Sequence, residues 1–315
     1  MAMILSVSRR TDIPNYYSDW FYNRIKEGFL YVRNPMNIHQ VSKISLSPEV
    51  VDCIVFWTKN PEPMMERLDE LRDYKYYFQF TLTGYGNDVE KNIPSKKEYM
   101  IPVFIKLSEQ IGADKVIWRY DPIFFNKIYT QEYHLKTFEY IASGLKGCTK
   151  KCVISFVDMY AKNKRNMDRL GIQNTSDNEI KRFAIQLNNI AHNYGIEIAT
   201  CAEKIDLSEY GIKHNSCIDQ KLVQSIVGYQ IQTQKDKNQR QECGCVESVD
   251  VGCYNTCKSG CKYCYANYSE KSVLKNNMNY DVNSQLLCSR LMEEDKVTER
   301  KVKSLKERQM SIFEL

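Results

Sequence analysis

Short, continuous apolar runs recur along the chain, separated by longer amphipathic stretches. Continuous rather than alternating apolar runs are typical of parallel strands that are buried on both faces of a sheet. The spacing between them leaves room for a helix and is too long for a hairpin. We therefore predict repeated strand–helix units with strands at 3–8, 53–58, 76–82, 115–120, 152–157 and 196–201.

The stretches between these runs have the length and periodicity of helices. Pro102 predicts that one of them is split or kinked. Six such units predict an α/β fold in the form of a TIM-like β/α barrel, partial or complete. Residues 29–47 interrupt the repeat and predict an inserted β-hairpin with its turn near residues 34–37. The predicted helices are 15–27, 61–73, 96–111, 131–145 and 177–194.

Polar residues that directly follow barrel strands line the active face of such a fold. The segments RRTD, WTKNP and WRYDP place cations there, which suits an anion such as phosphate or carboxylate. The alternative is that each residue serves only as a helix cap or in a loop salt bridge. We predict that the substrate-binding residues are Arg9, Arg10, Asp12 and Asp121.

The chain contains twelve cysteines, a high number for 315 residues. The first residues lack the pattern of a signal peptide and no apolar run is long enough to span a membrane, so we expect a cytoplasmic protein. In that setting metal binding or redox chemistry is a better interpretation than disulfides. The net charge of +5 neither requires nor excludes a nucleic-acid partner.

Three of these residues, Cys257, Cys261 and Cys264, have the spacing Cys-x₃-Cys-x₂-Cys. Three thiolates can each bind one iron of a 4Fe–4S cluster and leave the fourth iron open to another ligand. A structural zinc site needs four ligands, which Cys253 or Cys245 could complete, so zinc remains the alternative. Residues 246–251 and 267–277 flank this loop as a predicted strand and helix, which makes a seventh unit.

The segment CKSGCKYCYAN resembles the signature of radical S-adenosylmethionine enzymes, and in particular the corresponding loop of spore photoproduct lyase. The resemblance implies that the open iron chelates the amino and carboxylate groups of S-adenosylmethionine, with Tyr263 against its adenine. It also implies a 5′-deoxyadenosyl radical and an electron donor such as flavodoxin or ferredoxin. By chemical type alone, the candidates for holding the rest of the cofactor are Lys59, Arg119 and Glu203.

Nearly the whole chain is similar to the uncharacterised bacterial domain-of-unknown-function family 1848. The similarity lies in SVSRRTDIP, FWTKNP, YYFQFTLT, VIWRYDPI, VISFVD, CAEKIDLSEYGI and CGCVESVDVGCYNTC. The radical enzymes that the loop resembles usually carry the triad after their first strand, whereas here it follows the last one. A circular permutation would reconcile the two, with 246–251 placed beside 3–8.

Four further cysteines, Cys201, Cys217, Cys243 and Cys245, could close a second iron–sulfur cluster or a zinc site. The alternative is that Cys201 and Cys217 are simply buried thiols.

We divide the chain into barrel units at 1–228, a cysteine-rich unit at 229–280 that completes the barrel, and a charged tail at 281–315. Residues 295–308 look like a solvated helix. The terminal QMSIFEL resembles the peptide that binds the bacterial DNA sliding clamp, through Gln309, Ile312 and Phe313. The alternative is that the apolar pair docks on the protein's own surface.

Together these features predict a radical S-adenosylmethionine iron–sulfur enzyme that acts on DNA, by repairing or modifying a base lesion. The first alternative keeps the radical chemistry and changes the substrate to RNA, a peptide or a phosphorylated metabolite. The second is a non-catalytic adaptor that binds nucleic acid and uses an iron–sulfur cluster or zinc as a staple.

Overall fold

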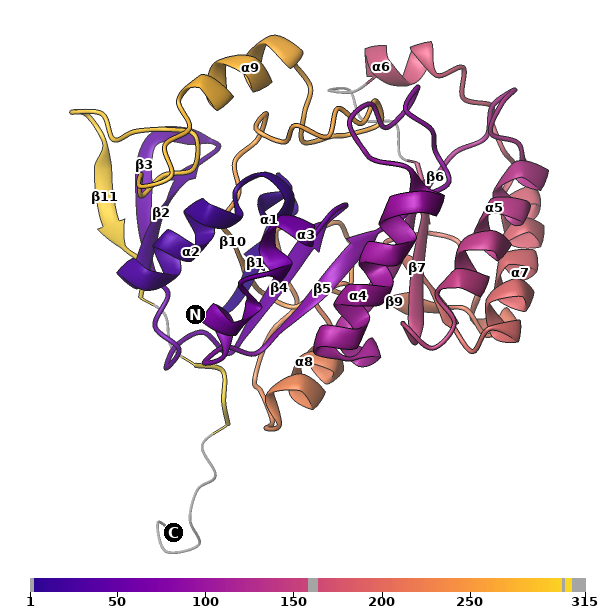
Figure 1. The fold of residues 1–315 in the computed structure, drawn as a ribbon, viewed down its shortest axis with the longest axis horizontal. Helices are drawn as coiled ribbons and strands as arrows, with labels where there is room; N and C mark the ends of the chain where they lie inside the picture. The colour runs from indigo at the N-terminus through magenta and orange to yellow at the C-terminus, as the bar shows by residue number, and fades with distance from the viewer. Residues whose placement is uncertain (1–2, 158–163, 302–303, 308–315) are drawn as a thin grey trace, which may run out of the picture.

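A single large parallel sheet organises the chain (Figure 1). The computed structural model describes residues 3–157, 164–301 and 304–307. The strand order is β10-β1-β4-β5-β6-β7-β8-β9, and every neighbouring pair is parallel. All six predicted strands are confirmed. The strands are β1 (Ile4–Val7), β4 (Cys53–Thr58), β5 (Tyr76–Thr81), β6 (Val116–Ile123), β7 (Lys151–Phe156), β8 (Glu197–Cys201), β9 (Lys213–Asn215) and β10 (Val249–Asp250).

The α/β class is therefore confirmed, but the predicted barrel is not. Within the described residues, the edge strands β9 and β10 each pair with one neighbour and not with each other. In the part of the chain that the structure describes, the sheet is therefore open, with β9 and β10 as its two edges.

Helices follow most strands, as predicted, with shorter and more broken forms. The predicted helix 15–27 breaks at Tyr17, and a π-helical turn (Lys96–Met100) precedes Pro102 at the start of α4, as its position predicted. The helices are α1 (Ile13–Tyr16), α2 (Ser18–Glu27), α3 (Glu62–Met65), α4 (Ile101–Ile111), α5 (Gln131–Gly144), α6 (Lys164–Arg169), α7 (Asp177–Asn193), α8 (Gln220–Val227) and α9 (Glu270–Met278).

Both faces of the sheet are buried, as the continuous apolar runs predicted. On one face Phe56, Phe80 and Trp118 form ring contacts with side chains of α2, α4 and α5. On the other face Val55 and Tyr77 pack against α8 and the segment 243–246. Among the described residues, this second face is therefore covered by the late part of the chain.

The late strand β10 lies beside β1, the arrangement that a circular permutation predicts. Leu5 pairs with Val249, and the carboxylate of Asp250 accepts hydrogen bonds from Ser6 Oγ at 2.9 Å and Ser8 Oγ at 2.7 Å. A Cβ on Gly252 would lie 2.0 Å from Ser8 Oγ. Only glycine lets the chain pass this close to the end of β1.

A second, three-stranded sheet contains the predicted hairpin. β2 (Phe29–Asn34) and β3 (Asn37–Ser45) are antiparallel, and β11 (Lys296–Glu299) pairs with β3 in parallel. The predicted helix at 295–308 is therefore wrong. Arg33 binds Asp295 with two hydrogen bonds of 2.6 and 2.7 Å, and the free edge of β3 then offers β11 backbone partners that override its helix propensity.

Gln309, Ile312 and Phe313 lie outside the described residues. Among the described helices, none combines the length and apolar character needed to cross a bilayer.

We expect His134 to make stability depend on pH. Its Nε2–H donates to the Phe124 carbonyl at 3.0 Å, its Nδ1 accepts from Tyr120 Oη at 2.8 Å, and burial lowers its pKa from 6.5 to about 4. The unfolded chain binds the proton more readily between these values, so the free energy of unfolding should fall by up to about 3 kcal/mol as the pH drops from 6.5 to 4. Urea unfolding across this range measures the effect.

Other groups also titrate in this window, so His134→Gln is the control. The variant cannot bind the proton and should show a flatter pH profile, even if it is less stable throughout. Parallel profiles for the two proteins would contradict the assignment.

Candidate functional site

The cysteine loop connects β10 to α9. Figure 1 shows this loop over one end of the sheet. The backbone of Asn255 adopts a left-handed conformation with φ of 55°, which asparagine tolerates better than most residues. Its N–H donates to the Ala266 carbonyl at 2.9 Å, and its Oδ1 accepts from the N–H groups of Tyr268 and Ser269. The loop is thus closed on itself at its base.

Cys257, Cys261 and Cys264 are free thiols in this loop, each partly exposed. The Cys264 N–H donates to the Cys261 carbonyl at 3.2 Å, and the Cys257 thiol donates to Ser259 Oγ at 3.3 Å. Burial raises the pKa of Cys257 to about 12, and it raises the pKa of the other two thiols as well. A metal that binds here must therefore displace protons from all three.

The two cysteines that could have completed a closed zinc site lie in other surroundings. The Cys253 thiol donates to the Tyr254 carbonyl at 3.6 Å and interacts electrostatically with Cys288. Cys245 contacts Cys217. With Cys253 engaged by Tyr254 and Cys288, the donor set left on this loop is the three thiols of the triad, which fits a cluster with one open iron better than a closed four-ligand ion.

The cysteine loop is anchored on the loop that follows β5. The Lys262 N–H donates to the Val89 carbonyl at 3.0 Å, and the Asn92 N–H donates to the Ser259 carbonyl at 3.1 Å. The Asn92 side chain adds a bond of 2.6 Å to the Lys258 carbonyl. Two segments far apart in the sequence are held together by backbone hydrogen bonds on both sides of Cys261.

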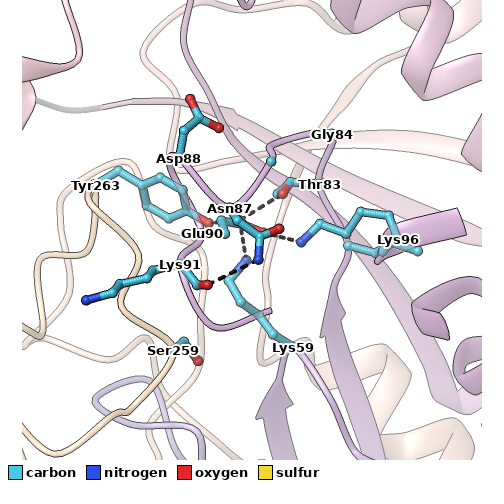
Figure 2. A network of polar contacts seen from close by, with 12 residues as sticks. Lys59, Thr83, Gly84, Asn87, Asp88, Glu90, Lys91, Lys96, Ser259 and Tyr263 are labelled. Atoms are coloured by element: carbon cyan, nitrogen blue, oxygen red, sulfur yellow. Dashed lines mark hydrogen bonds and ion pairs between the residues drawn. The ribbon is translucent and has the colours of Figure 1, made fainter. Parts of the chain in front are cut away.

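The carboxylate of Glu90 is buried at the centre of this contact (Figure 2). It accepts hydrogen bonds from Lys59 Nζ at 2.7 Å, Thr83 Oγ1 at 2.8 Å, Lys96 Nζ at 2.5 Å and the Tyr263 hydroxyl. Burial opposes its ionisation, but the two lysines outweigh burial and lower its pKa to about 2. An ionised carboxylate between two ammonium groups leaves a net positive charge beside Tyr263.

Sequence reasoning missed Glu90 and Lys96. The signal was present in TLTGYGNDVEKN, where an acidic residue follows two glycines just beyond a strand. Chain position alone does not show that this loop reaches the cysteine loop.

Asp12 and Lys59 are joined at the ends of β1 and β4. Asp12 caps α1 by accepting from the Asn15 N–H at 3.1 Å, and it also accepts from the Lys59 N–H at 2.8 Å. Burial raises the pKa of Asp12 to about 6. Asp12 was predicted to bind substrate, and the structure shows it as a helix cap, the alternative role. It also positions the backbone of Lys59, which binds Glu90.

Arg9 and Arg10 lie beside a cavity of about 260 Å³. Arg9 stacks over Trp57 at 5.0 Å, and Arg10 stacks over Tyr254 at 5.2 Å and faces Asp250 at 3.9 Å. Arg9 Nη2 is buried without a hydrogen-bond partner among the described residues. The charged residues that line the cavity are Arg9, Arg10, Arg33, Arg300, Asp236 and Asp250, an excess of positive charge.

Of the remaining predicted residues, Arg119 and Asp121 lie on β6, and Glu203 follows β8. Arg119 pairs with Asp121, which accepts from Ser155, and its Nη1 lies 2.8 Å from Cys217 Sγ. Glu203 accepts from the Phe156 N–H at 2.7 Å. Arg119 therefore contacts one of the four cysteines outside the triad, Cys217, whereas Lys59 lies beside the triad. The cofactor-binding roles of Arg119 and Glu203 stay predictions.

The second cysteine group is brought together by the fold. The sulfurs of Cys201 and Cys217 are 3.2 Å apart, Cys217 contacts Cys245, and Cys245 contacts Cys243. Hydrogen bonds from Cys201 and Cys245 outweigh burial and hold the pKa of Cys217 well below its usual range. The contacts are pairwise: in the part of the chain described, no three such side chains already surround one metal position.

The family described as Domain of unknown function (DUF1848) matches residues 4–266, most of the chain. The chain belongs to this family. The match extends from β1 past Cys264, so the cysteine loop is part of the family's domain, while α9 and β11 lie beyond it. A search of curated proteins finds no match.

Proposed function

We propose that the protein is a radical S-adenosylmethionine enzyme that acts on a nucleic acid, most specifically on a base lesion in DNA. The observation that carries this proposal is the three-thiol loop held beside a buried carboxylate that is bracketed by two lysines. A structural staple needs neither an incomplete donor set nor a charged group that binds the residue before the last cysteine.

The side chains around the triad fit the cofactor that the loop's resemblance implies. Cys257, Cys261 and Cys264 would hold the cluster, which supplies the electron that cleaves the sulfonium of S-adenosylmethionine. Glu90 holds the Tyr263 hydroxyl and so fixes the ring that would lie against adenine. Lys59, 5.6 Å from that ring, brings positive charge suited to the methionine carboxylate.

An anionic substrate fits the arginine-lined cavity. Arg9 Nη2 and Ser248 Oγ both line it, and both are buried without a hydrogen-bond partner among the described residues. A phosphate group would satisfy these donors, because guanidinium groups bind phosphate oxygens at two points. The backbone of DNA or RNA, or a phosphorylated metabolite, supplies this group; a peptide does so only when it is phosphorylated.

Three further parts of the proposal rest on sequence alone. They are binding of a DNA sliding clamp through Gln309, Ile312 and Phe313, reduction by flavodoxin or ferredoxin, and a cytoplasmic location. The clamp is what favours DNA over the other phosphorylated substrates.

Anaerobic reconstitution tests the proposal. Protein loaded with iron and sulfide, reduced with dithionite and mixed with S-adenosylmethionine should release 5′-deoxyadenosine, measured by liquid chromatography. A colourless, zinc-loaded protein that leaves S-adenosylmethionine intact would instead support the non-catalytic adaptor.

A further inference from the structure

We infer that Cys201, Cys217, Cys243 and Cys245 bind a single tetrahedral metal ion of the zinc class, at a site separate from the triad. The four residues come from three places: the end of β8, the segment after β9, and the loop before β10. This inference does not rest on the proposed radical chemistry.

The arrangement of the sulfurs carries the assignment. Cys201 Sγ and Cys217 Sγ are 3.2 Å apart, and contacts continue from Cys217 to Cys245 and from Cys245 to Cys243. Four sulfurs at 2.3 Å from one zinc ion lie about 3.8 Å from each other. Small side-chain rotations would therefore place these thiols around one ion.

The spacing also separates this group from the cubane type of site. In a 4Fe–4S cluster each cysteine binds a different iron, so the four sulfurs are spread over the corners of a larger body. Sulfurs already in contact with each other fit one ion better. The contacts between the sulfurs therefore favour zinc over the second iron–sulfur cluster that the sequence also allowed.

The surroundings suit thiolate ligands. Arg119 Nη1 lies 2.8 Å from Cys217 Sγ, and the Ile218 N–H donates to Cys245 Sγ at 3.3 Å. Arg9 also interacts electrostatically with Cys217 and Cys245. One zinc ion with four thiolates carries two negative charges, which these two guanidinium groups offset; such outer contacts orient ligands in metal sites.

A metal at this site would have a structural role, because it would fix the segment 228–248. It runs between α8 and β10 and contains no helix or strand of its own, only isolated bridges at Ile231 and at Lys235 with Val246. Most of its residues are polar, and its buried apolar side chains are Ile231, Cys243, Cys245 and Val246. It is nevertheless packed closely, since a Cβ on Gly244 would lie 2.5 Å from Ser216 Oγ. A metal would fix this segment over the face of the sheet that carries Val55 and Tyr77.

The test uses the full chain with the triad replaced, as Cys257→Ala, Cys261→Ala and Cys264→Ala. This variant, expressed with zinc, should hold about one equivalent of zinc by mass spectrometry. Adding Cys243→Ser and Cys245→Ser should remove that zinc. Adding Cys148→Ser, a cysteine outside both groups, should leave it in place.

The double replacement also removes packing, so a second measurement uses the intact four-thiol group. Co²⁺ added to the metal-free triad variant should give the charge-transfer and ligand-field bands of a tetrahedral tetrathiolate site. Lack of zinc together with lack of these bands would overturn the inference. So would a Cys201–Cys217 disulfide in protein purified under reducing conditions, or iron bound with labile sulfide in the triad variant.

Discussion

Replacing Cys261 by alanine should abolish both cluster binding and release of 5′-deoxyadenosine. With two thiolates left, the loop offers too few ligands to hold a 4Fe–4S cluster that keeps one iron open. The expected loss is complete within detection, because the cofactor has no other route to cleavage. Iron and sulfide content, the visible absorption of the reconstituted protein, and 5′-deoxyadenosine yield measure it.

The matched control is Cys253→Ala, in the same loop and four residues before Cys257. Its thiol interacts with Tyr254 and Cys288, so the variant should keep its colour and its turnover. Equal losses in the two variants would mean that the loop is fragile as a whole. Full activity of Cys261→Ala would show that the triad takes no part in the reaction.

Replacing Glu90 by glutamine should loosen the cysteine loop and destabilise the protein. The substitution keeps the shape but leaves two lysines, both largely buried, without their anion. Breaking a buried ion pair by removing one partner costs about 3–5 kcal/mol. Urea unfolding gives the free energy, and the rate of iron loss from the reconstituted protein reports on the loop.

Two further variants separate this charge effect from general damage. Glu132→Gln removes the partner of an exposed Glu–Lys pair on α5 and should change the free energy of unfolding very little. Adding Lys59→Met to Glu90→Gln removes one of the stranded cations and should restore part of the lost stability. If Glu90→Gln costs no more than Glu132→Gln, the buried network does not hold the loop.

The main sheet was largely predictable because parallel strands buried on both faces leave continuous apolar runs, such as CIVFWT and CVISFV. Whether the sheet closes into a barrel could not be predicted, because this depends on whether β9 and β10 pair. Both strands are too short to leave a continuous apolar run in the sequence. β11 was missed for a related reason. A charged segment with helix propensity becomes a strand when Arg33 and Asp295 hold it against the edge of β3.

The candidate site divides in the same way. Chemical type and spacing predict Cys257, Cys261 and Cys264 as ligands, and they also grouped four further cysteines that the structure brings into contact. They could not find Glu90, because its role arises from a contact between loops on β5 and β10. Arg119 was predicted to follow a strand but lies inside β6, and its contact with Cys217 could be learned only from the fold.

The pairing of β10 with β1 has a consequence for the order in which the protein is made. Asp250 binds Ser6 across a sequence separation of 244 residues, so the strand that carries the cysteine loop docks only after the rest of the sheet has been synthesised. The other strands of the main sheet therefore leave the ribosome before the cysteine loop does. If the loop holds the proposed cluster, iron–sulfur assembly factors would meet it only after those strands have been made.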